Sequence, residues 1–287
     1  MPEGRVLAPL GRRAAGLLAR EQYGPYVVLR CADSGGPVPA AGQFYMVAAA
    51  ERWGGGEDER PFLPRAFSVM RARPGSGGVE LEFVLEDVGP GTRRLCELSP
   101  GEGLLLVGPL GQGFAAPHDG RRPVLVGGGV GIAPLVIWAE TLGAAGEPGA
   151  LGGAGEVLLG FRDRHHAAGA ALVPGARVAT DDGSAGHHGL VTELLEAELD
   201  RDERAEVYAC GPPAMLEAVR RICVEREVPG QLALESGMAC GYGACFGCVV
   251  ATREGFVRLC VEGPVLEAAR LEPIDVGRGE LSEAPAR

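Results

Sequence analysis

The sequence contains no lysine, so all 27 of its basic residues are arginine. Acidic residues outnumber them, the net charge is −11, and nowhere do the arginines gather into a basic stripe. A protein whose main task is to bind nucleic acid needs such a surface, because contacts to phosphates supply much of that affinity. We therefore exclude nucleic-acid binding and expect small-molecule chemistry or protein partners.

Long apolar runs are missing as well. The longest, 124–139, is interrupted by four glycines and a proline, which makes it too short and too irregular to span a bilayer. The first twenty residues contain arginines but no uninterrupted apolar core of the secretory-signal type. We expect a cytoplasmic protein without a membrane span, and thiols in that compartment normally stay reduced.

With 287 residues, the chain is long enough for two domains with separate cores. The first part consists of short apolar runs between Gly and Pro turns, which predicts an antiparallel β-barrel or sandwich. From Pro123 onward strands alternate with helices, which predicts a parallel sheet covered by helices. We expect an α+β multi-domain protein, with a β-barrel over 1–117 (1–20 peripheral), an α/β parallel-sheet domain over 118–234 and a small C-terminal subdomain over 235–287.

Four of the eight cysteines lie close together in the C-terminal part. Cys240, Cys245 and Cys248 form C-x4-C-x2-C, and Cys260 follows after eleven intervening residues. Structural zinc sites favour two short ligand pairs that close a tetrahedron, whereas this spacing is the plant-type [2Fe–2S] pattern. Small residues between the ligands would let backbone N–H groups turn toward the sulfurs. We predict these four as metal ligands of a [2Fe–2S] cluster, with zinc as the alternative.

The remaining cysteines and the histidines give weaker signals. The other cysteines are scattered singly in apolar contexts and are expected in the core: Cys31, Cys96, Cys210 and Cys223. The histidine pair at 165–166 is expected to be solvated. The pair at 187–188 lies in a polar loop and has no evident partner for binding a metal.

Two short motifs in the first part suggest contacts to a phosphorylated ligand. In "RAFSV", Arg65 is suited to neutralise a pyrophosphate, and Ser68 to present its hydroxyl or N–H to a ring edge. "GPGT" precedes an apparent helix and places Gly91 and Thr92 where backbone N–H groups and a hydroxyl could meet an anion. Read alone, "RAFSV" is more often a strand with one exposed arginine, and an ordinary turn would look the same as "GPGT".

Two turns between a strand and a helix in the second part suggest a dinucleotide site. "VLVGGGVGIAPL" contains Gly128, Gly129 and Gly131, but the G-x-G-x-x-G fingerprint is absent because Ile132 occupies its last position. "ACGPPAML" places Cys210 and Gly211 at the carboxyl edge of the sheet, where open α/β folds bind ligands. A tight turn without a ligand remains the alternative for both.

Taken in order along the chain, these motifs make the sequence resemble the ferredoxin–NADP reductase superfamily. Within it, the sequence is similar to the electron-transfer subunits of class 1B dihydroorotate dehydrogenase. The resemblance covers about Gly24 to Leu266. It rests on "RAFSV", "GPGT", "GPLGQGF", "VGGGVGIAPL", "TDDGSAG", "CGPPAML" and, most specifically, "ESGMACGYGACFGC" followed by "CVEGPVL".

The resemblance implies a flavin domain, a nucleotide domain and a [2Fe–2S] subdomain, in that order. It places FAD along four residues of the barrel and near its phosphate-binding turn: Arg65, Ala66, Phe67, Ser68, Gly91 and Thr92. It places NAD(H) at Gly128, Gly129, Gly131, Cys210 and Gly211, and it makes Ser68 and Cys210 the expected catalytic residues. Ala66 departs from the family, which usually has Pro at this position.

The three cofactors together imply a converter between electron pairs and single electrons, because nicotinamide takes hydride, a cluster takes one electron and flavin does both. No region remains for oxidising a substrate. The resemblance therefore implies a partner, an FMN-containing dihydroorotate dehydrogenase catalytic subunit with a TIM barrel, in a heterotetramer. The rival functions are a reductase subunit of an NAD(P)H-dependent hydrogenase or of a bifurcating ferredoxin:NADP oxidoreductase, and a zinc-stabilised binding protein. Asp163 between Arg162 and Arg164 leaves NAD or NADP open.

Anaerobic purification is expected to give a coloured protein with flavin absorption, a broad iron–sulfur shoulder and about two iron atoms per chain. NADH should bleach both signals, because hydride enters the flavin and single electrons pass to the cluster. Visible spectra before and after NADH, with metal analysis, measure this. Flavin absorption without iron would contradict our interpretation of the cysteines, and a colourless protein containing zinc would favour the zinc alternative.

Overall fold

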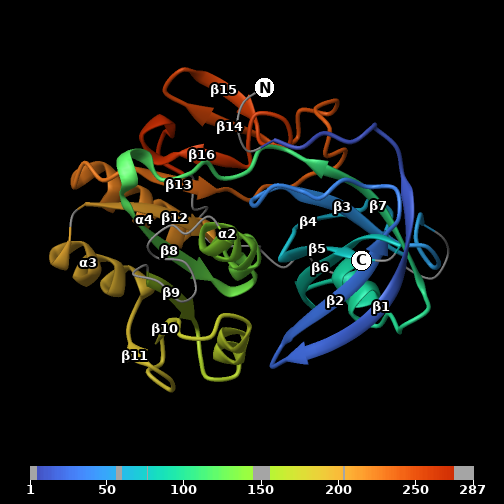
Figure 1. Cartoon of the computed structure of the whole chain (residues 1–287), viewed down its shortest axis with the longest axis horizontal. Helices are drawn as coiled ribbons and strands as arrows, with labels where there is room; N and C mark the ends of the chain where they lie inside the picture. The colour runs from blue at the N-terminus through green and yellow to red at the C-terminus, as the bar shows by residue number, and fades with distance from the viewer. Residues whose placement is uncertain (1–4, 56–59, 76, 145–155, 203, 275–287) are drawn as a thin grey trace, which may run out of the picture.

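The computed structural model describes residues 5–55, 60–75, 77–144, 156–202 and 204–274. In this part of the chain, two seven-stranded sheets stand side by side, with a two-stranded hairpin beside them (Figure 1). Residues 1–4, 56–59, 76, 145–155, 203 and 275–287 lie outside this description, and they include the ends of the predicted peripheral segment 1–20 and of the C-terminal subdomain 235–287. None of the helices described is long and apolar enough to cross a membrane.

The first sheet is antiparallel throughout, in the order β4-β3-β7-β1-β2-β6-β5. Its two edge strands, β4 and β5, are joined only by Val69 and Met70. Val69 N–H donates a hydrogen bond to Gln43 O beside β3, and Met70 N–H donates one to Glu82 O of β6. The two-residue link therefore joins the two ends of the sheet, and the sheet curls into a barrel. The strands are β1 (Arg13–Tyr23), β2 (Tyr26–Asp33), β3 (Phe44–Ala49), β4 (Arg65–Ser68), β5 (Arg71–Gly75), β6 (Gly78–Glu86) and β7 (Gly103–Leu110).

The predicted barrel is thus confirmed, and the reason is visible in its side chains. Along β1 and β6, buried residues alternate with less buried ones, as a sheet with one face on the core requires. The predicted helix after "GPGT" is α1 (Pro90–Cys96), which contacts β3 and β6 and buries Leu95.

The second sheet has the order β11-β10-β9-β8-β12-β13-β16 and is parallel except for its last strand. All six residues of β12 are buried, as expected for a parallel strand covered on both faces. His187 and His188, predicted to lie in a loop, form the short strand β11 beside β10. The strands are β8 (Arg122–Gly128), β9 (Glu156–Phe161), β10 (Arg177–Thr180), β11 (His187–His188), β12 (Ala205–Cys210), β13 (Gly230–Ala233) and β16 (Val265–Glu267).

Three α-helices cover this sheet. α3 (Val191–Arg201) and α4 (Pro213–Glu225) contact each other and lie on one face. α2 (Ile132–Ala144) contacts β8 and β12 and also β5 of the barrel, so it lies between the two sheets. Short 3₁₀ turns complete the described chain: η1 (His118–Gly120), η2 (Gly129–Gly131), η3 (His166–Leu172) and η4 (Ala268–Arg270).

The cysteine-rich segment is tied to both sheets. Its hairpin, β14 (Val249–Thr252) and β15 (Gly255–Arg258), stands apart as a two-stranded sheet. The chain then returns as β16, which pairs antiparallel with β13. Just before β16, Gly263 O accepts a hydrogen bond from Gln112 N–H (2.6 Å), next to the end of β7. The segment is therefore anchored at the junction of the two sheets.

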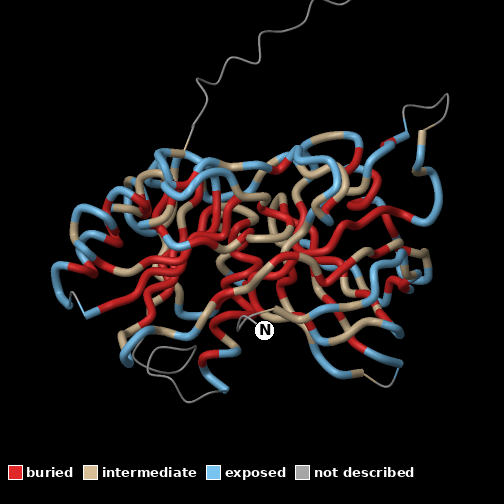
Figure 2. Tube along the Cα trace, turned by 90° about the horizontal axis from the view of Figure 1, so that it is seen from above, coloured by how far each residue is buried: buried red, intermediate tan, exposed pale blue. Residues whose placement is uncertain are grey.

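An aromatic cluster fills the space where the chain crosses from the barrel to the second sheet. Phe114 packs against Trp138 of α2 and Tyr208 of β12, with ring centroids 5.6 Å away in each case. Tyr208 donates its hydroxyl hydrogen to Ala115 O. Figure 2 shows buried segments running through the middle of the molecule, with exposed segments around them.

Arg71 of β5 links the two domains by charge. Its Nε lies 2.6 Å from Glu140 Oε1 of α2, and its Nη2 donates to Leu172 O of η3 at 3.1 Å. Glu82 of the barrel accepts a third bond from it at 3.3 Å. One half-buried guanidinium therefore satisfies acceptors on both sides of the interface.

Arg71→Ala is expected to destabilise the protein by about 1–3 kcal/mol, because it leaves these partners without a charged donor. Arg221→Ala is the matched control, since Arg221 makes a 3.5 Å ion pair with Glu225 on the exposed face of one helix. Such a pair contributes roughly 0.5 kcal/mol or less. Urea unfolding of both variants measures the difference, and equal effects would show that Arg71 does not hold the domains together.

Candidate functional site

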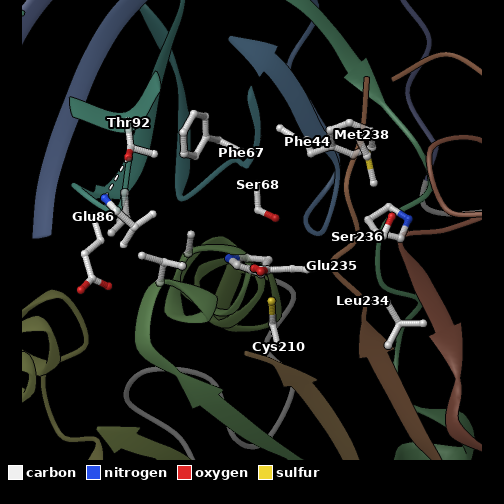
Figure 3. Close-up of a pocket in the computed structure, with 17 residues that line it drawn as sticks. Phe44, Phe67, Ser68, Glu86, Thr92, Cys210, Leu234, Glu235, Ser236 and Met238 are labelled. Atoms are coloured by element: carbon white, nitrogen blue, oxygen red, sulfur yellow. Dashed lines mark hydrogen bonds between the residues drawn. The ribbon is translucent and has the colours of Figure 1, made fainter. Parts of the chain in front are cut away.

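A cavity of about 230 Å³, here called the junction cavity, lies where the two sheets meet (Figure 3). The barrel supplies one wall, chiefly β4, with Val84 and Glu86 of β6 and the turn that leads into α1. The opposite wall comes from the turn after β8, the end of β12 and residues 234–238. Both domains and the segment leading to the cysteines are therefore needed to form it.

β4 supplies three predicted site residues to this cavity. β4 is an edge strand and pairs only with β3, so its outer side is open. Ala66, Phe67 and Ser68 all line the cavity, and Figure 3 shows the Ser68 hydroxyl pointing into it. The structure therefore brings these three residues together on one wall of the cavity.

Arg65, at the start of β4, lies outside the cavity lining and against the start of α1. A Cβ atom at Gly91 would come within 2.6 Å of Arg65 Nε, so the guanidinium can lie over this turn only because residue 91 is glycine. Arg65 also lies over the ring of Trp53 (6.0 Å to the centroid) and donates to Leu63 O at 2.6 Å. An anion beside α1 would thus meet a cation that is already positioned.

Thr92 lines the junction cavity, but its hydroxyl already has partners within the turn. Thr92 Oγ1 accepts from Val88 N–H at 2.9 Å and donates to Gly89 O at 3.1 Å. The side chain thereby closes the "GPGT" turn around the start of the helix.

The opposite wall brings two ionisable groups together, Cys210 and Glu235. β12 and β13 are parallel, with Cys210 paired with Ala233, so both strands end at the same edge and Glu235 follows two residues later. In Figure 3 both side chains face the space that Ser68 faces from the barrel. Glu235 was not among the predicted site residues, although a carboxylate directly after an apolar strand at this edge was a usable signal.

The surrounding protein raises the pKa of both groups, so each holds its proton to a higher pH than usual. It raises the pKa of the Cys210 thiol well above its ordinary value, and the Glu235 carboxyl adds to this shift. The Glu235 side chain is open to the junction cavity and to a neighbouring cavity of about 290 Å³. Even so, the surrounding protein partly desolvates it and raises the pKa of its carboxyl. Cys210 is thus a neutral thiol, and Glu235 is the group able to exchange a proton.

A larger depression of about 490 Å³, here called the groove, runs along the carboxyl edge of the second sheet. Two of the glycines predicted to bind the dinucleotide, Gly128 and Gly129, line it together with Arg162 and Asp181. Glu86 and Val88 of the barrel line both the groove and the junction cavity, which makes the two spaces neighbours.

The glycines of the turn after β8 are required for different structural reasons. Gly129 has φ +54°, a conformation that side-chain-bearing residues rarely adopt, and it borders the groove. Gly131 lines neither space; a Cβ there would lie 2.3 Å from Cys210 O, so it allows the two turns to pack together. Gly211 likewise lines neither space, and Cys210 lines the junction cavity rather than the groove.

His166 was predicted to be solvated, and this is wrong. It is buried between the two domains, with its ring edge-on to Tyr26 of the barrel. Asp163 Oδ1 lies 2.7 Å from its Nδ1, and this hydrogen bond lowers the pKa of the Asp163 carboxyl. The stretch "RDRHH" is fully polar, and only the packing of η3 against the barrel reveals the burial of His166.

The four clustered cysteines form two pairs. Cys248 Sγ and Cys260 Sγ lie 3.2 Å apart and are buried, while Cys240 and Cys245 interact through their side chains and Cys245 is exposed. Among the described residues, no three His, Cys, Asp or Glu side chains are grouped to hold a single metal ion. Two pairs of thiols fit a two-iron cluster, in which each iron takes two cysteines, better than a one-ion tetrahedron.

Backbone N–H groups turn toward the sulfurs of Cys240 and Cys245, as we predicted from the small residues between the cysteines. Burial opposes ionisation of Cys240, but hydrogen bonds from the backbone of Cys245, Tyr242 and Ala244 outweigh it and lower the pKa of this thiol to about 6. Gly247 N–H points toward Cys245 Sγ at 3.5 Å. This part of the loop therefore stabilises the thiolate of Cys240, which is the form that binds metal, whereas burial and the neighbouring Cys248 raise the pKa of the Cys260 thiol to about 12.

Short stretches of chain connect the cysteines to the junction cavity. Met238 and Pro264 line the cavity and are two and four residues from Cys240 and Cys260. Gly241 packs on the barrel, since a Cβ there would lie 2.4 Å from Met46 Cγ. The cavity therefore lies between the groove on one side and the cysteines on the other.

Comparison with known proteins agrees with this arrangement. Residues 235–272 match the iron-sulfur cluster binding domain of dihydroorotate dehydrogenase B. The chain is 34% identical over 234 residues to the dihydroorotate dehydrogenase B (NAD(+)) electron transfer subunit of Clostridium perfringens, covering 81% of this chain and 87% of that one. It is 37% identical to the corresponding subunit of Desulforamulus reducens, covering 73% and 80%.

Solved structures support the fold. The NADH-dependent reduced ferredoxin–NADP oxidoreductase superposes with a TM-score of 0.73 at 24% identity, and the match covers 90% of each chain. The ferredoxin reductase of carbazole 1,9a-dioxygenase gives a TM-score of 0.62 at 22% identity, covering 77% of this chain and 67% of that one. At these identities the likeness concerns the fold.

Proposed function

The chain belongs to the family of dihydroorotate dehydrogenase B electron transfer subunits, and from this we propose that it passes electrons from a partner dehydrogenase through a [2Fe–2S] cluster and FAD to NAD+. The observation that carries the proposal is the position of the junction cavity. It shares residues with the groove on one side and is linked by short stretches of chain to the paired cysteines on the other.

This order suits the chemistry. Nicotinamide exchanges hydride, a cluster exchanges one electron, and flavin supplies the step between them. A flavin in the junction cavity would be held on the barrel side by Ala66, Phe67 and Ser68, with Arg65 and the turn at Gly91 and Thr92 toward its phosphates. The glycine turn at Gly128 and Gly129 would receive the nicotinamide nucleotide, while Gly131 and Gly211 keep its two supporting turns in contact.

The chain's own residues also handle a proton. Forming NADH takes two electrons and one proton, so a proton must reach the junction cavity in each turnover. Glu235 fits this role, because it lines both that cavity and the neighbouring 290 Å³ cavity and holds its proton more tightly than an exposed carboxyl. Ser68 and the neutral thiol of Cys210 offer hydroxyl and thiol contacts that orient the ring.

The partner we propose is an FMN-containing catalytic subunit with a TIM barrel, which oxidises dihydroorotate to orotate in pyrimidine biosynthesis, in a heterotetramer. The cysteines of the described residues form no disulfide bond, which is consistent with a reducing cytoplasm. A reductase subunit of a hydrogenase or of a bifurcating oxidoreductase is the second candidate. The 34–37% identity to dihydroorotate dehydrogenase subunits favours the first.

Co-expression with a dihydroorotate dehydrogenase catalytic chain tests the function. The purified complex should reduce NAD+ with dihydroorotate, whereas the chain alone should oxidise NADH with ferricyanide but leave dihydroorotate untouched. Oxidation of dihydroorotate by the isolated chain would contradict the proposed division of labour. Co-purification with nickel or additional iron–sulfur subunits would favour the second candidate.

When NADH is turned over with one-electron acceptors, a proton must leave the junction cavity and Glu235 would accept it. Glu235→Gln is therefore expected to slow this turnover by roughly 10²-fold, the usual size of a general-base contribution. Bleaching of the flavin by NADH should persist, because hydride transfer itself needs no proton from Glu235. Since the carboxyl pKa is raised and only the carboxylate can accept this proton, wild-type turnover should rise as pH rises through that pKa, and the variant should lose this dependence. Stopped-flow pH profiles measure both, with the exposed Glu196→Gln as control; an unchanged profile in Glu235→Gln would exclude the role.

A further inference from the structure

A cluster of charges lies at the boundary between the barrel and the groove. Arg162, just after β9, has a side chain that is 63% exposed, and its Nη2 lies 3.3 Å from Glu86 Oε1 at the end of β6. His166 contacts the same guanidinium from the other side, with Arg162 Nε donating to its Nε2 at 2.9 Å. Arg162 is therefore held between a carboxylate of one domain and an imidazole of the other.

His166 can accept this hydrogen bond because of Asp163. With Nδ1–H donated to Asp163 Oδ1, Nε2 keeps a free lone pair directed at Arg162. In this tautomer the imidazole orients the guanidinium and adds no negative charge beside it, and its Nε2 also lies 3.4 Å from Glu86 Oε1. The positive charge of Arg162 thus remains available to an anion.

Of the two groups that hold the Arg162 guanidinium, Glu86 makes the weaker contact. It makes one contact with Arg162 at 3.3 Å, and the pair is open to solvent on the arginine side. Glu86 also lines the groove itself, so its carboxylate faces the space that an anionic ligand would enter. A ligand phosphate and Glu86 would therefore compete for the same guanidinium.

The position of Arg162 suits such a ligand. β8 and β9 are parallel with Gly128 paired to Gly160, so Arg162 leaves the sheet at the same edge as the glycine turn. Arg162 is the one arginine among the described residues that line the groove. Arg164 nearby is occupied, since its guanidinium donates to Ser184 O and its backbone N–H to Ser184 Oγ.

We propose that Arg162 binds a phosphate of the dinucleotide by exchanging Glu86 for it, so that Glu86 is a built-in competitor that weakens nucleotide binding. The inference rests on the proposed use of a nicotinamide dinucleotide. Because Glu86 belongs to the barrel and also lines the junction cavity, the exchange removes a contact between the two domains whenever a nucleotide enters.

The test is calorimetric titration of the cofactor-loaded protein with three ligands: ADP-ribose, 2′-phospho-ADP-ribose and adenosine. The variants are Glu86→Gln, Arg162→Gln and the double variant. Glu80→Gln is the control, because Glu80 lies on the same strand β6 but pairs with Arg30 at 3.8 Å and does not line the groove. Retained flavin absorption and an unchanged melting temperature show that each variant is folded.

Glu86→Gln should tighten ADP-ribose binding by about two- to fivefold, the range for freeing one partly exposed ion pair. Arg162→Gln should weaken it about tenfold or more, as expected for loss of a charge-assisted bond to phosphate, and should leave adenosine unaffected. The double variant should bind ADP-ribose no more tightly than Arg162→Gln alone, because Glu86 competes with the ligand only through Arg162. Effects shared by both phosphorylated ligands assign Arg162 to the pyrophosphate, and effects confined to 2′-phospho-ADP-ribose assign it to the 2′-phosphate.

An equal gain from Glu86→Gln with and without Arg162 would overturn the exchange, since it would mean that Glu86 simply repels the ligand. No gain in the Arg162-containing protein would overturn it as well. Failure of the wild-type protein to bind either phosphorylated ligand would overturn both the exchange and the proposed use of a dinucleotide. Binding that is insensitive to both substitutions would overturn the exchange alone.

Discussion

The contact between α2 and the barrel is the interaction on which the rest of the structure depends. Neither sheet forms the junction cavity alone, because each supplies one wall. The aromatic cluster of Phe114, Trp138 and Tyr208 joins the sheets by apolar burial, and Arg71 adds directional bonds to Glu140 and Leu172. Electron transfer between two bound groups falls steeply with distance, so a fixed relation between these two domains is a condition for the proposed function.

Much of this architecture could be predicted from the sequence, because it follows from local patterns. The alternation in β6, the buried run of β12 and the glycine turn after β8 each carry their own signal. The four clustered cysteines were predicted from spacing, and in the structure they form two pairs. Their pairing follows from the loop itself, whose small residues allow it to fold back on the sulfurs.

The residues that sequence reasoning missed owe their roles to contacts between distant segments. Glu235 meets Cys210 only because β12 and β13 end in register, and His166 is buried only because η3 packs on the barrel. Gly131 shows the reverse case. Its place in a glycine-rich turn predicted a ligand contact, but the close approach of Cys210 O explains the glycine. Local sequence patterns do not encode which side of a turn another strand will occupy.

The return of the chain through β16 has a consequence for assembly. The last cysteine, Cys260, precedes by only a few residues the strand that completes the edge of the second sheet. Holding Cys260 in a metal cluster would fix the start of that strand, so part of the free energy of metal binding becomes free energy of folding. Iron supply and the integrity of the nucleotide domain are then thermodynamically linked: loss of the cluster would loosen the sheet edge at β13, beside the segment that carries Glu235.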